Sequence, residues 1–332
     1  MSRDSFRALI VDQVDGQPRA TVREAGQEEL PAGDVLISVA YSCLNYKDGL
    51  AVTGQGKIIR KYPMAPGIDL AGTVVESESP DFKPGDEVIV TGWGVGESHW
   101  GGYAQLARMQ AGWLVPVPEG LSMRQAMAIG TAGFTAMLSV IALEERGLTP
   151  EAGEVIVTGA SGGVGSIAVA ILARLGYQVV ASTGRTELHD YLRKLGARDI
   201  IDRNDLAEPP GRPMVSGRWA GAIDVVGSHT LASLLAAMAP NSSIAVCGLA
   251  GGSDLQTTVF PLILRGVSLL GINSVLAPQA QRRDVWRRLA QDLPQDILEM
   301  MTQVVPLAEV ISLSQQIIAG EVQGRVVVDL NA

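Results

Sequence analysis

Cysteine, histidine and aromatic residues are scarce in this sequence of 332 residues. There are three histidines and two cysteines, and aromatic side chains make up 5% of the chain. Cys43 and Cys247 lie far apart in apolar, strand-like segments, so a disulfide framework is not indicated and both are expected to be buried thiols. The few cysteines and histidines also lack the fixed spacing of the three or four ligands that zinc requires. The sequence therefore predicts no metal site.

An excess of positive charge is also missing. Lys and Arg number 26 against 35 Asp and Glu, which gives a formal net charge of −9. Such a chain has no broad basic field for nucleic acid or for an anionic membrane, and neither partner is expected. Lys57, Arg60 and Lys61 form a local basic cluster that is either a solvated face or an attractor for a small polyanionic ligand. A second cluster, at 282–288, lies on an amphipathic pattern and is interpreted as a solvated helix face.

A targeting segment is not apparent either. No apolar stretch near the N-terminus is long enough for a signal peptide or a membrane span. The composition, 47% hydrophobic and 18% charged, is typical of a soluble globular chain of about two domains. We therefore expect a cytoplasmic protein.

The most informative motif is a glycine-rich turn. Residues 155–158 read as a buried strand, the turn Gly-Ala-Ser-Gly-Gly-Val-Gly covers 159–165, and an amphipathic helix and a second strand follow. Gly162, Gly163 and Gly165 let the backbone turn sharply, so that its N–H groups at the start of the helix face a pyrophosphate. Ala160 replaces the first glycine of the usual fingerprint. The context predicts dinucleotide binding, and the alternative is a tight strand-to-helix turn without a ligand.

The end of the second strand indicates which dinucleotide binds. An acidic side chain there would accept hydrogen bonds from the ribose of NAD, but the chain has Ser182, Thr183, Gly184 and Arg185. Hydroxyl and guanidinium groups suit the 2′-phosphate of NADP, so NADPH is the expected cofactor. The alternative for Arg185 is a solvated arginine in a first helical turn, and Glu187 is interpreted as a helix-start acid.

The predicted secondary structure changes from short strands to alternating strands and helices, and the final strand resembles the first part again. Up to about residue 120, short strands broken by turns predict a partly open β barrel. An alanine-rich helix from residue 122 then leads into alternating strands and helices, with strands near 155, 178, 199, 222, 243 and 268. This alternation predicts a doubly wound parallel sheet, and thus an α/β fold. A helix at 307–319 and a strand at 324–330 close the chain, and this strand is expected to rejoin the barrel.

This order resembles the medium-chain dehydrogenase/reductase superfamily over the whole chain. The resemblance implies a β-rich GroES-like catalytic domain, residues 1–123 and 276–332, into which a Rossmann NADP-binding domain, residues 124–275, is inserted. Six segments are similar to the NADPH-dependent acryloyl-CoA reductases, also labelled quinone oxidoreductase-like proteins. They are LNYKD at 44–48, GQGKIIR at 54–60, PGIDLAG at 66–72, TGWGVGESHWGG at 91–102, IGTAGFTAM at 129–137 and QGR at 323–325.

The same resemblance locates the positions where zinc-dependent relatives carry metal ligands. Those relatives have Cys and His where this chain has Asn45 and Tyr46, and His-Glu where it has Ile68 and Asp69. Their third ligand position falls near Thr131. The resemblance therefore implies a zinc-free member that reduces the double bond of a short enoyl-CoA, most simply acryloyl-CoA to propanoyl-CoA, by hydride addition to the β-carbon.

The resemblance also implies a set of site residues. Tyr46 is the candidate catalytic residue: its ring lines the nicotinamide pocket and its hydroxyl donates a hydrogen bond, although it can also act by packing alone. Asp48 is interpreted as a helix cap and Lys47 as its ion-pair partner. Besides Tyr46, the cofactor contacts are expected from Ser161, Gly162, Gly163, Val164, Thr183, Gly184, Arg185, Arg203, Leu249, Ile263 and Ser274. The acyl-CoA contacts are expected from Lys57, Arg60, Lys61 and Arg325, the last at the mouth of the active cleft.

Two alternative functions remain open on the sequence. A quinone or enone oxidoreductase would use the same hydride donor without needing a basic patch for the nucleotide of CoA. A cofactor-retaining binding or structural protein would belong to a different class. Whatever its activity, the protein is expected to form a homodimer, paired through an edge strand near 268–274, as is common in the superfamily.

Overall fold

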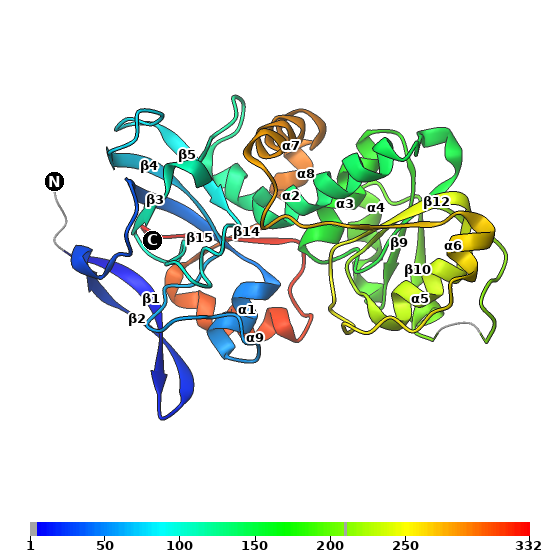
Figure 1. Cartoon of the computed structure of the whole chain (residues 1–332), viewed down its shortest axis with the longest axis horizontal. Helices are drawn as coiled ribbons and strands as arrows, with labels where there is room; N and C mark the ends of the chain where they lie inside the picture. Colours follow the sequence, from blue (N-terminus) through cyan, green and yellow to red (C-terminus); the bar gives the residue numbers. More distant parts are fainter. Residues whose placement is uncertain (1–4, 209–210) are drawn as a thin grey trace. The chain divides into compact units, whose positions relative to one another are not determined.

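The structure, a computed structural model, describes residues 5–208 and 211–332 (Figure 1). The chain forms two compact units. Unit 1 consists of Met1–Thr131, Val275–Ala290 and Met301–Ala332, and unit 2 consists of Ala132–Ser274 and Gln291–Met300. The first unit is thus built from both ends of the chain. The boundaries predicted for the two folding domains, 1–123 with 276–332 and 124–275, stay a prediction.

Unit 1 is β-rich. Its seven-stranded sheet has the order β14-β15-β3-β4-β5-β7, and β6 pairs with β3. The strands are β3 Val35–Leu44, β4 Asp69–Ser77, β5 Glu87–Thr91, β6 Leu106–Met109, β7 Val115–Pro116, β14 Thr302–Pro306 and β15 Arg325–Asp329. A separate hairpin pairs β1 Ser5–Val14 with β2 Gln17–Gly26. β-Branched residues of these strands fill the core of the unit, because a pleated sheet buries one face of each strand.

The last strand returns to the first part of the chain, as predicted. β15 runs antiparallel to β3, with Val326 opposite Leu44, and parallel to β14 on its other side (Figure 1). Residues near 45 and residues near 325 therefore become neighbours. Three strands were not predicted: β2, which carries many polar residues, and the short strands β7 and β14.

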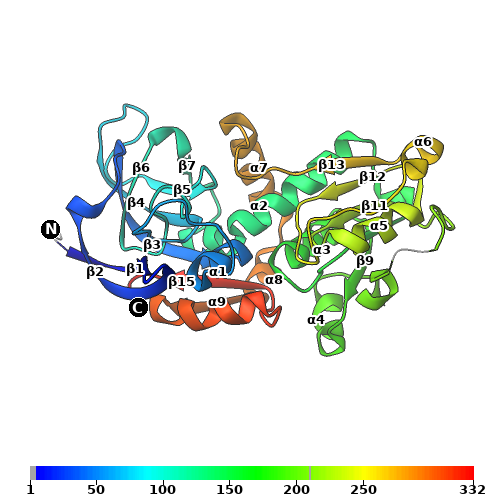
Figure 2. The same ribbon diagram turned by 60° about the horizontal axis from the view of Figure 1, so that its bottom comes forward.

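Helices α1 (Tyr46–Thr53) and α9 (Val310–Ile318) lie side by side in unit 1 (Figures 1 and 2). They approach closely at Gly49, where an added Cβ would lie 2.7 Å from a methyl carbon of Ile317. The third helix, α7 (Gln279–Asp292), belongs mostly to this unit. α1 follows β3 directly, so the sheet and α9 together fix where α1 begins.

Helix α2 (Met123–Glu145) is long and apolar enough to cross a membrane by length and composition alone, but 83% of its most apolar stretch is buried inside the protein. It is not continuous, because Gly130 has φ 51° and ψ −159°, which are not helical angles. The sequence predicts the helix and does not reveal the break. The residue after the break, Thr131, is the last residue of unit 1 in this part of the chain.

Unit 2 contains the predicted doubly wound sheet. Its six strands are parallel and lie in the order β10-β9-β8-β11-β12-β13. The strands are β8 Glu154–Val157, β9 Gln178–Thr183, β10 Asp199–Asp202, β11 Trp219–Asp224, β12 Met238–Val246 and β13 Ser268–Gly271, and the helices are α3 Gly163–Arg174, α4 His189–Lys194, α5 Ser228–Ala237, α6 Phe260–Arg265 and α8 Gln295–Met300. The strand order reverses between β8 and β11, and ligands bind at such a point outside the carboxyl ends of the strands.

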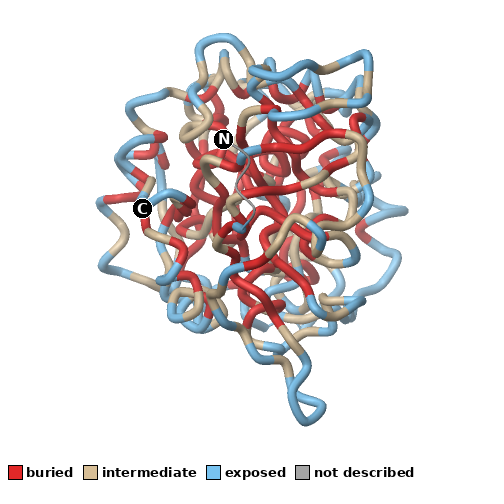
Figure 3. The backbone as a smooth tube through the Cα atoms, turned by 90° about the vertical axis from the view of Figure 1, so that its left-hand side faces the viewer, coloured by how far each residue is buried: buried red, intermediate tan, exposed pale blue. Residues whose placement is uncertain are grey.

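Most strands of the two units are largely buried, whereas β2, β10, β13 and β14 are partly exposed. Figure 3 shows the buried stretches in red and the exposed turns in pale blue. Of the two cysteines, both of which are unpaired, Cys43 is buried as expected, whereas Cys247 is partly exposed. Cys247 follows the end of β12, where the chain leaves the sheet, so it is less covered than a strand residue.

Candidate functional site

The glycine-rich turn connects β8 to α3 at the carboxyl edge of the sheet in unit 2. Gly159 has φ +55°, a conformation that side chains other than glycine rarely adopt. A Cβ added at Gly165 would lie 2.7 Å from the Cα of Ala160, so only glycine lets the helix approach the strand this closely. Gly162 precedes the first residue of α3 in an extended conformation. The backbone N–H groups in the first turn of α3 have no carbonyl acceptor within the helix, so they can donate to a pyrophosphate.

The residues predicted for the 2′-phosphate gather beside this turn. A guanidinium nitrogen of Arg185 donates to Ser161 Oγ at 2.7 Å, and the backbone N–H of Arg185 donates to Thr183 Oγ1 at 3.2 Å. Because β9 and β10 are parallel with Thr183 opposite Asp202, Arg203 emerges next to Thr183. A Cβ at Gly184 would clash with the Arg203 side chain, which lies directly over that glycine.

Two guanidinium groups thus share one small region of unit 2. Burial lowers the pKa of Arg185, and the positive charge of Arg203 acts in the same direction. Cations placed this close repel each other unless an anion neutralises them. Together with the hydroxyls of Ser161 and Thr183, they offer charged and neutral donors to a phosphate monoester, which NADP has and NAD lacks. These residues fit the expected cofactor.

Three more predicted cofactor residues lie farther along the chain. Leu249 follows β12 and Ser274 follows β13, so both lie at the carboxyl edge of the sheet, as the glycine-rich turn does. Ile263 lies on α6 and is 71% exposed. The end of α6 is fixed at the opposite edge, because Arg265 donates to the carbonyl oxygen of Met238, the first residue of β12. The structure therefore does not bring Ile263 together with the other two.

One buried residue at this edge was not predicted. Asp224, the last residue of β11, accepts a hydrogen bond from Thr158 Oγ1 at 2.6 Å and from the N–H of Gly227 at 2.8 Å. Its burial raises the pKa of its carboxyl group. Asp224 joins the ends of β8 and β11, where the strand order reverses. An acidic residue directly after an apolar strand is the sequence signal that could have indicated it.

In unit 1, Tyr46 is the first residue of α1 and is 40% exposed. Asp48 caps the helix as predicted, because its Oδ2 accepts the N–H of Asn45 at 3.0 Å. Lys47 was expected to pair with Asp48, and this was wrong. Its ammonium group lies 2.8 Å from a carboxylate oxygen of Glu97, since Asp48 is fully buried and already has backbone donors.

Arg325 does not lie at the surface, contrary to the predicted position at the mouth of a cleft. It is 2% exposed, and its guanidinium donates to the carbonyl oxygen of Ala128 at 2.7 Å, to Asn45 Oδ1 at 3.3 Å and to Cys43 Sγ at 3.1 Å. A group enclosed by protein acceptors does not fit as a ligand for the phosphates of CoA. We therefore assign Arg325 to the buried cluster around Asp69.

The predicted basic cluster of unit 1 is accessible. Lys57, Arg60 and Lys61 are all exposed in the loop that follows α1. Within residues 5–208 and 211–332, none of the three forms an ion pair. Three positive charges within five consecutive residues can therefore attract a polyanion without first breaking an internal contact.

The pH dependence of stability provides a test of the Asp48 site. Burial and the negative charge of Asp69 raise the pKa of Asp48 from 3.8 to about 7. The folded state thus binds this proton more tightly than the unfolded state, so the free energy of unfolding that Asp48 contributes falls as the pH rises from about 4 to 7. We expect urea unfolding to show that the stability advantage of the wild type over Asp48→Asn shrinks between about pH 4 and pH 7. An advantage that grows with pH would contradict the raised pKa.

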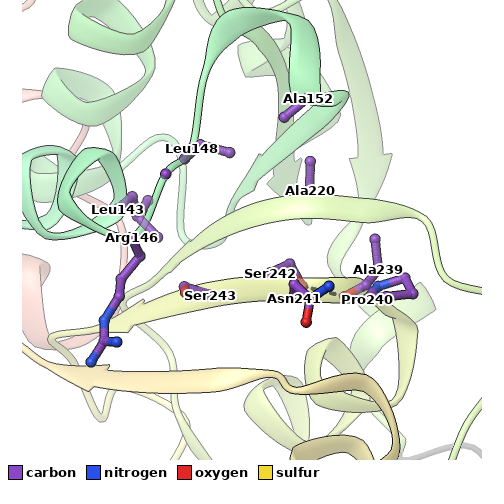
Figure 4. A pocket seen from close by; sticks show the side chains of 11 residues that line it. Leu143, Arg146, Leu148, Ala152, Ala220, Ala239, Pro240, Asn241, Ser242 and Ser243 are labelled. Atoms are coloured by element: carbon purple, nitrogen blue, oxygen red, sulfur yellow. Dashed lines mark hydrogen bonds between the residues drawn. The ribbon is translucent and has the colours of Figure 1, made fainter.

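A pocket in unit 2 lies away from these groups. Its lining includes Arg146, Leu148, Ala220, Asn241 and Ser243, and it opens where β11 and β12 begin (Figure 4). Because all strands of the sheet are parallel, this is the edge opposite the glycine-rich turn. The pocket is therefore separate from the candidate cofactor site.

Comparison with known proteins agrees with the two-part architecture. Residues 31–119 match the family described as alcohol dehydrogenase GroES-like domain, and residues 163–291 match the family described as zinc-binding dehydrogenase. Together with the parallel sheet and its glycine-rich turn, these matches define the class: a medium-chain dehydrogenase/reductase.

Full-length relatives narrow this class. The acrylyl-CoA reductase AcuI of Ruegeria pomeroyi is 54% identical over 329 residues, which cover 98% of this chain and 100% of that protein. A crystal structure of the YhdH oxidoreductase from Salmonella enterica in complex with NADP has a TM-score of 0.96 at 54% identity and covers 97% of this chain and 99% of that one. The structure of Bacillus subtilis YhfP with NAD bound has a TM-score of 0.95 at 48% identity, with 98% and 99% coverage. The chain belongs to the family of the acrylyl-CoA reductase AcuI.

The residues at the zinc positions of relatives do not fit a zinc ion. Asn45 and Thr131 are poor ligands for zinc, and Ile68 has no ligand atom. Asp69 is fully hydrogen-bonded, and the Cys43 thiol donates to it while the Arg325 guanidinium lies 3.1 Å from the sulfur. Burial and nearby carboxylates raise the pKa of Cys43 well above its usual value, which opposes the thiolate that a metal needs. One zinc per chain in protein purified without added metal would contradict this conclusion.

Proposed function

We propose that this protein is an NADPH-dependent reductase of a short enoyl-CoA and converts acryloyl-CoA to propanoyl-CoA. The observation that carries the proposal is the similarity to the acrylyl-CoA reductase AcuI, 54% identical over 98% of this chain and 100% of that protein. The cluster of Ser161, Thr183, Arg185 and Arg203 supports NADPH, rather than NADH, as the hydride donor.

The residues of the chain divide the work between cofactor and substrate. The glycine-rich turn and the two arginines hold the pyrophosphate and the 2′-phosphate, with Leu249 and Ser274 as further contacts. When bound, NADPH supplies the hydride that adds to the β-carbon of the substrate. The electron pair of the double bond then moves toward the thioester oxygen, and a proton is added at the α-carbon. The Tyr46 hydroxyl donates a hydrogen bond to that oxygen as its negative charge develops.

A spectrophotometric assay tests the proposal directly. The absorbance of NADPH is followed with acryloyl-CoA, beside parallel reactions with NADH and with a simple quinone. Turnover with NADPH and the CoA ester, and slow turnover with NADH, is the expected result. Turnover with the quinone alone would show that the substrate is a quinone and not the thioester. No turnover with any of them would favour a binding or structural protein that retains the cofactor.

A quinone or enone oxidoreductase is the second candidate function. It is favoured by one relative, the putative quinone oxidoreductase YhfP of Bacillus subtilis, which is 48% identical over 326 residues. The basic cluster distinguishes the two candidates, because a quinone has no phosphate groups for it to attract.

Charge reversal tests the basic cluster. In the variant with Lys57→Glu, Arg60→Glu and Lys61→Glu, we expect the KM for acryloyl-CoA to rise about tenfold, because long-range attraction of the CoA phosphates becomes repulsion. The KM for the corresponding pantetheine thioester, which lacks the nucleotide phosphates, should not change. The effect should also weaken at high salt. Equal effects on both thioesters would show that the cluster does not recognise CoA.

We further propose a homodimer formed through unit 2. β13 is the edge strand of the six-stranded sheet, so its outer backbone groups have no neighbouring strand within that sheet. Leu269 on this strand and Phe260, Ile263 and Leu264 on α6 are exposed. Twofold pairing of β13 would bury such apolar surface and complete the strand's hydrogen bonds. Sedimentation velocity should give the mass of two chains, and a monomer at working concentration would refute the proposal.

The proposed location is the cytoplasm, without a membrane or nucleic-acid partner. α2, long and apolar enough to cross a membrane, has most of its apolar stretch buried in the fold. The net charge of −9 does not favour polyanionic partners other than the small ones that the basic cluster can attract.

A further inference from the structure

Three segments of unit 1 meet around one carboxylate: the end of β3 with the start of α1, the start of β4, and the break in α2. Asp69, the first residue of β4, has no exposed surface. It accepts hydrogen bonds from Cys43 Sγ at 3.1 Å and from Asn45 Nδ2 at 2.9 Å. Cys43 lies near the end of β3, and Asn45 directly precedes α1. It also accepts the backbone N–H of Thr131 at 2.8 Å and the hydroxyl of the same residue.

The break in α2 makes the contact with Thr131 possible. The non-helical angles of Gly130 turn the next N–H group toward Asp69 instead of along the helix. A Cβ at Gly130 would lie 2.7 Å from both Asp69 Oδ2 and Cys43 Sγ, so a larger residue would push into the cluster. The local conformation of α2 and the position of the carboxylate are therefore coupled.

The cluster is connected to Tyr46 through the neighbouring residue Asn45. Both polar atoms of the Asn45 side-chain amide form hydrogen bonds. Nδ2 donates to Asp69 and to Asp48, and Oδ1 accepts from Arg325. Arg325 supplies a buried positive charge that balances the carboxylates, and a charge buried without such a partner is costly. Asp48 accepts the backbone N–H of Asn45, and Arg325 donates to the carbonyl oxygen of Leu44, so this cluster holds the backbone at which α1 begins.

We propose that Asp69 is a positioning residue for the reaction. Its carboxylate connects the three segments by hydrogen bonds and thereby fixes the start of α1 and the direction of Tyr46. The proposal rests on the proposed function, because it takes Tyr46 as the residue that acts on the substrate. Asp69 itself does not contact substrate.

Two measurements on Asp69→Asn test this role. The variant keeps the shape of the side chain, but its amide has one acceptor oxygen and directs an NH₂ group at donors. Hydrogen–deuterium exchange in residues 44–53 should become about tenfold faster, while residues 154–183 of unit 2 exchange as in the wild type. The kcat for acryloyl-CoA should fall about tenfold in the wild-type background and less than about twofold in Tyr46→Phe, since residues that act through one another are not additive.

Controls separate positioning from general damage. Asp86→Asn removes a carboxylate that accepts a backbone N–H in a turn of the same unit and should change neither readout. Thr131→Val keeps the hydrogen bond from the backbone N–H to Asp69 and removes only the one from the hydroxyl. If Asp69→Asn does not fold, the kcat of Thr131→Val is compared in the wild-type and Tyr46→Phe backgrounds instead. Unchanged exchange in 44–53, or an equal loss of kcat in both backgrounds, would overturn the proposal. If the wild type does not reduce acryloyl-CoA, the proposed function fails and the exchange measurement alone decides on Asp69.

Discussion

Replacing Arg185 and Arg203 together by alanine is expected to lower kcat/KM for NADPH about 1000-fold while leaving kcat/KM for NADH within about threefold. Each hydrogen bond to a charged group is worth about 1.5–3 kcal/mol, so two that are lost amount to about 4 kcal/mol, or three powers of ten. NADH lacks the 2′-phosphate, and its reaction does not use these contacts. The measurement is initial-rate kinetics with each cofactor at saturating acryloyl-CoA.

The matched control for this pair is Arg193→Ala. Arg193 is a cation of the same unit that is exposed on α4, and its removal should change neither cofactor's kinetics. A parallel loss with NADPH and NADH in the double variant would mean that the arginines maintain the fold of the site and do not read the phosphate. No loss with either cofactor would agree with the alternative interpretation of Arg185 as a solvated residue.

The Tyr46→Phe variant is expected to lower kcat for acryloyl-CoA about 100-fold, with the KM for NADPH unchanged. The substitution keeps the ring and removes the hydroxyl, and the loss of one donor to a developing oxyanion costs about 10²–10³ in kcat. Stopped-flow measurement of NADPH oxidation in a single turnover reports the chemical step itself.

Tyr62→Phe is the control for the loss of a tyrosine hydroxyl in the same unit. Tyr62 packs against the core and is not part of the proposed site. If Tyr46→Phe retains the rate of the wild type, Tyr46 acts only by packing, the alternative that the sequence left open. If the KM for NADPH rises together with the loss of kcat, Tyr46 belongs to the cofactor pocket as well.

The cofactor half of the candidate site could be predicted because its pattern is local. The glycine-rich turn, the hydroxyls after β9 and Arg185 lie within one strand-helix-strand unit, whose geometry is the same in many proteins. Arg203 comes from outside this strand-helix-strand unit, and the order of the parallel strands brings it to the adjacent position.

The buried cluster of unit 1 could not be predicted in the same way. It depends on the pairing of β15 with β3, two strands that lie near opposite ends of the sequence, and on the break in α2 at Gly130. The Gly-Arg dipeptide at 324–325 indicates neither that Arg325 is buried nor that α2 is broken. Arg325 was therefore expected at the mouth of the active cleft. Asp69 was noted only as a residue that differs from a zinc ligand, although it is the acceptor that organises the cluster.

The burial of Cys43 has a practical consequence for following the protein in solution. Its sulfur is fully covered, holds its proton firmly and donates it to Asp69, whereas Cys247 is partly exposed. Alkylating reagents attack the thiolate, and burial together with the negative charge of Asp224 raises the pKa of Cys247 to about 12. Both thiols should therefore react slowly under native conditions, with Cys247 reacting before Cys43 because it is partly exposed. The rate at which Cys43 becomes labelled then reports how often unit 1 opens locally. A bound substrate that stabilises the folded unit should lower this labelling rate.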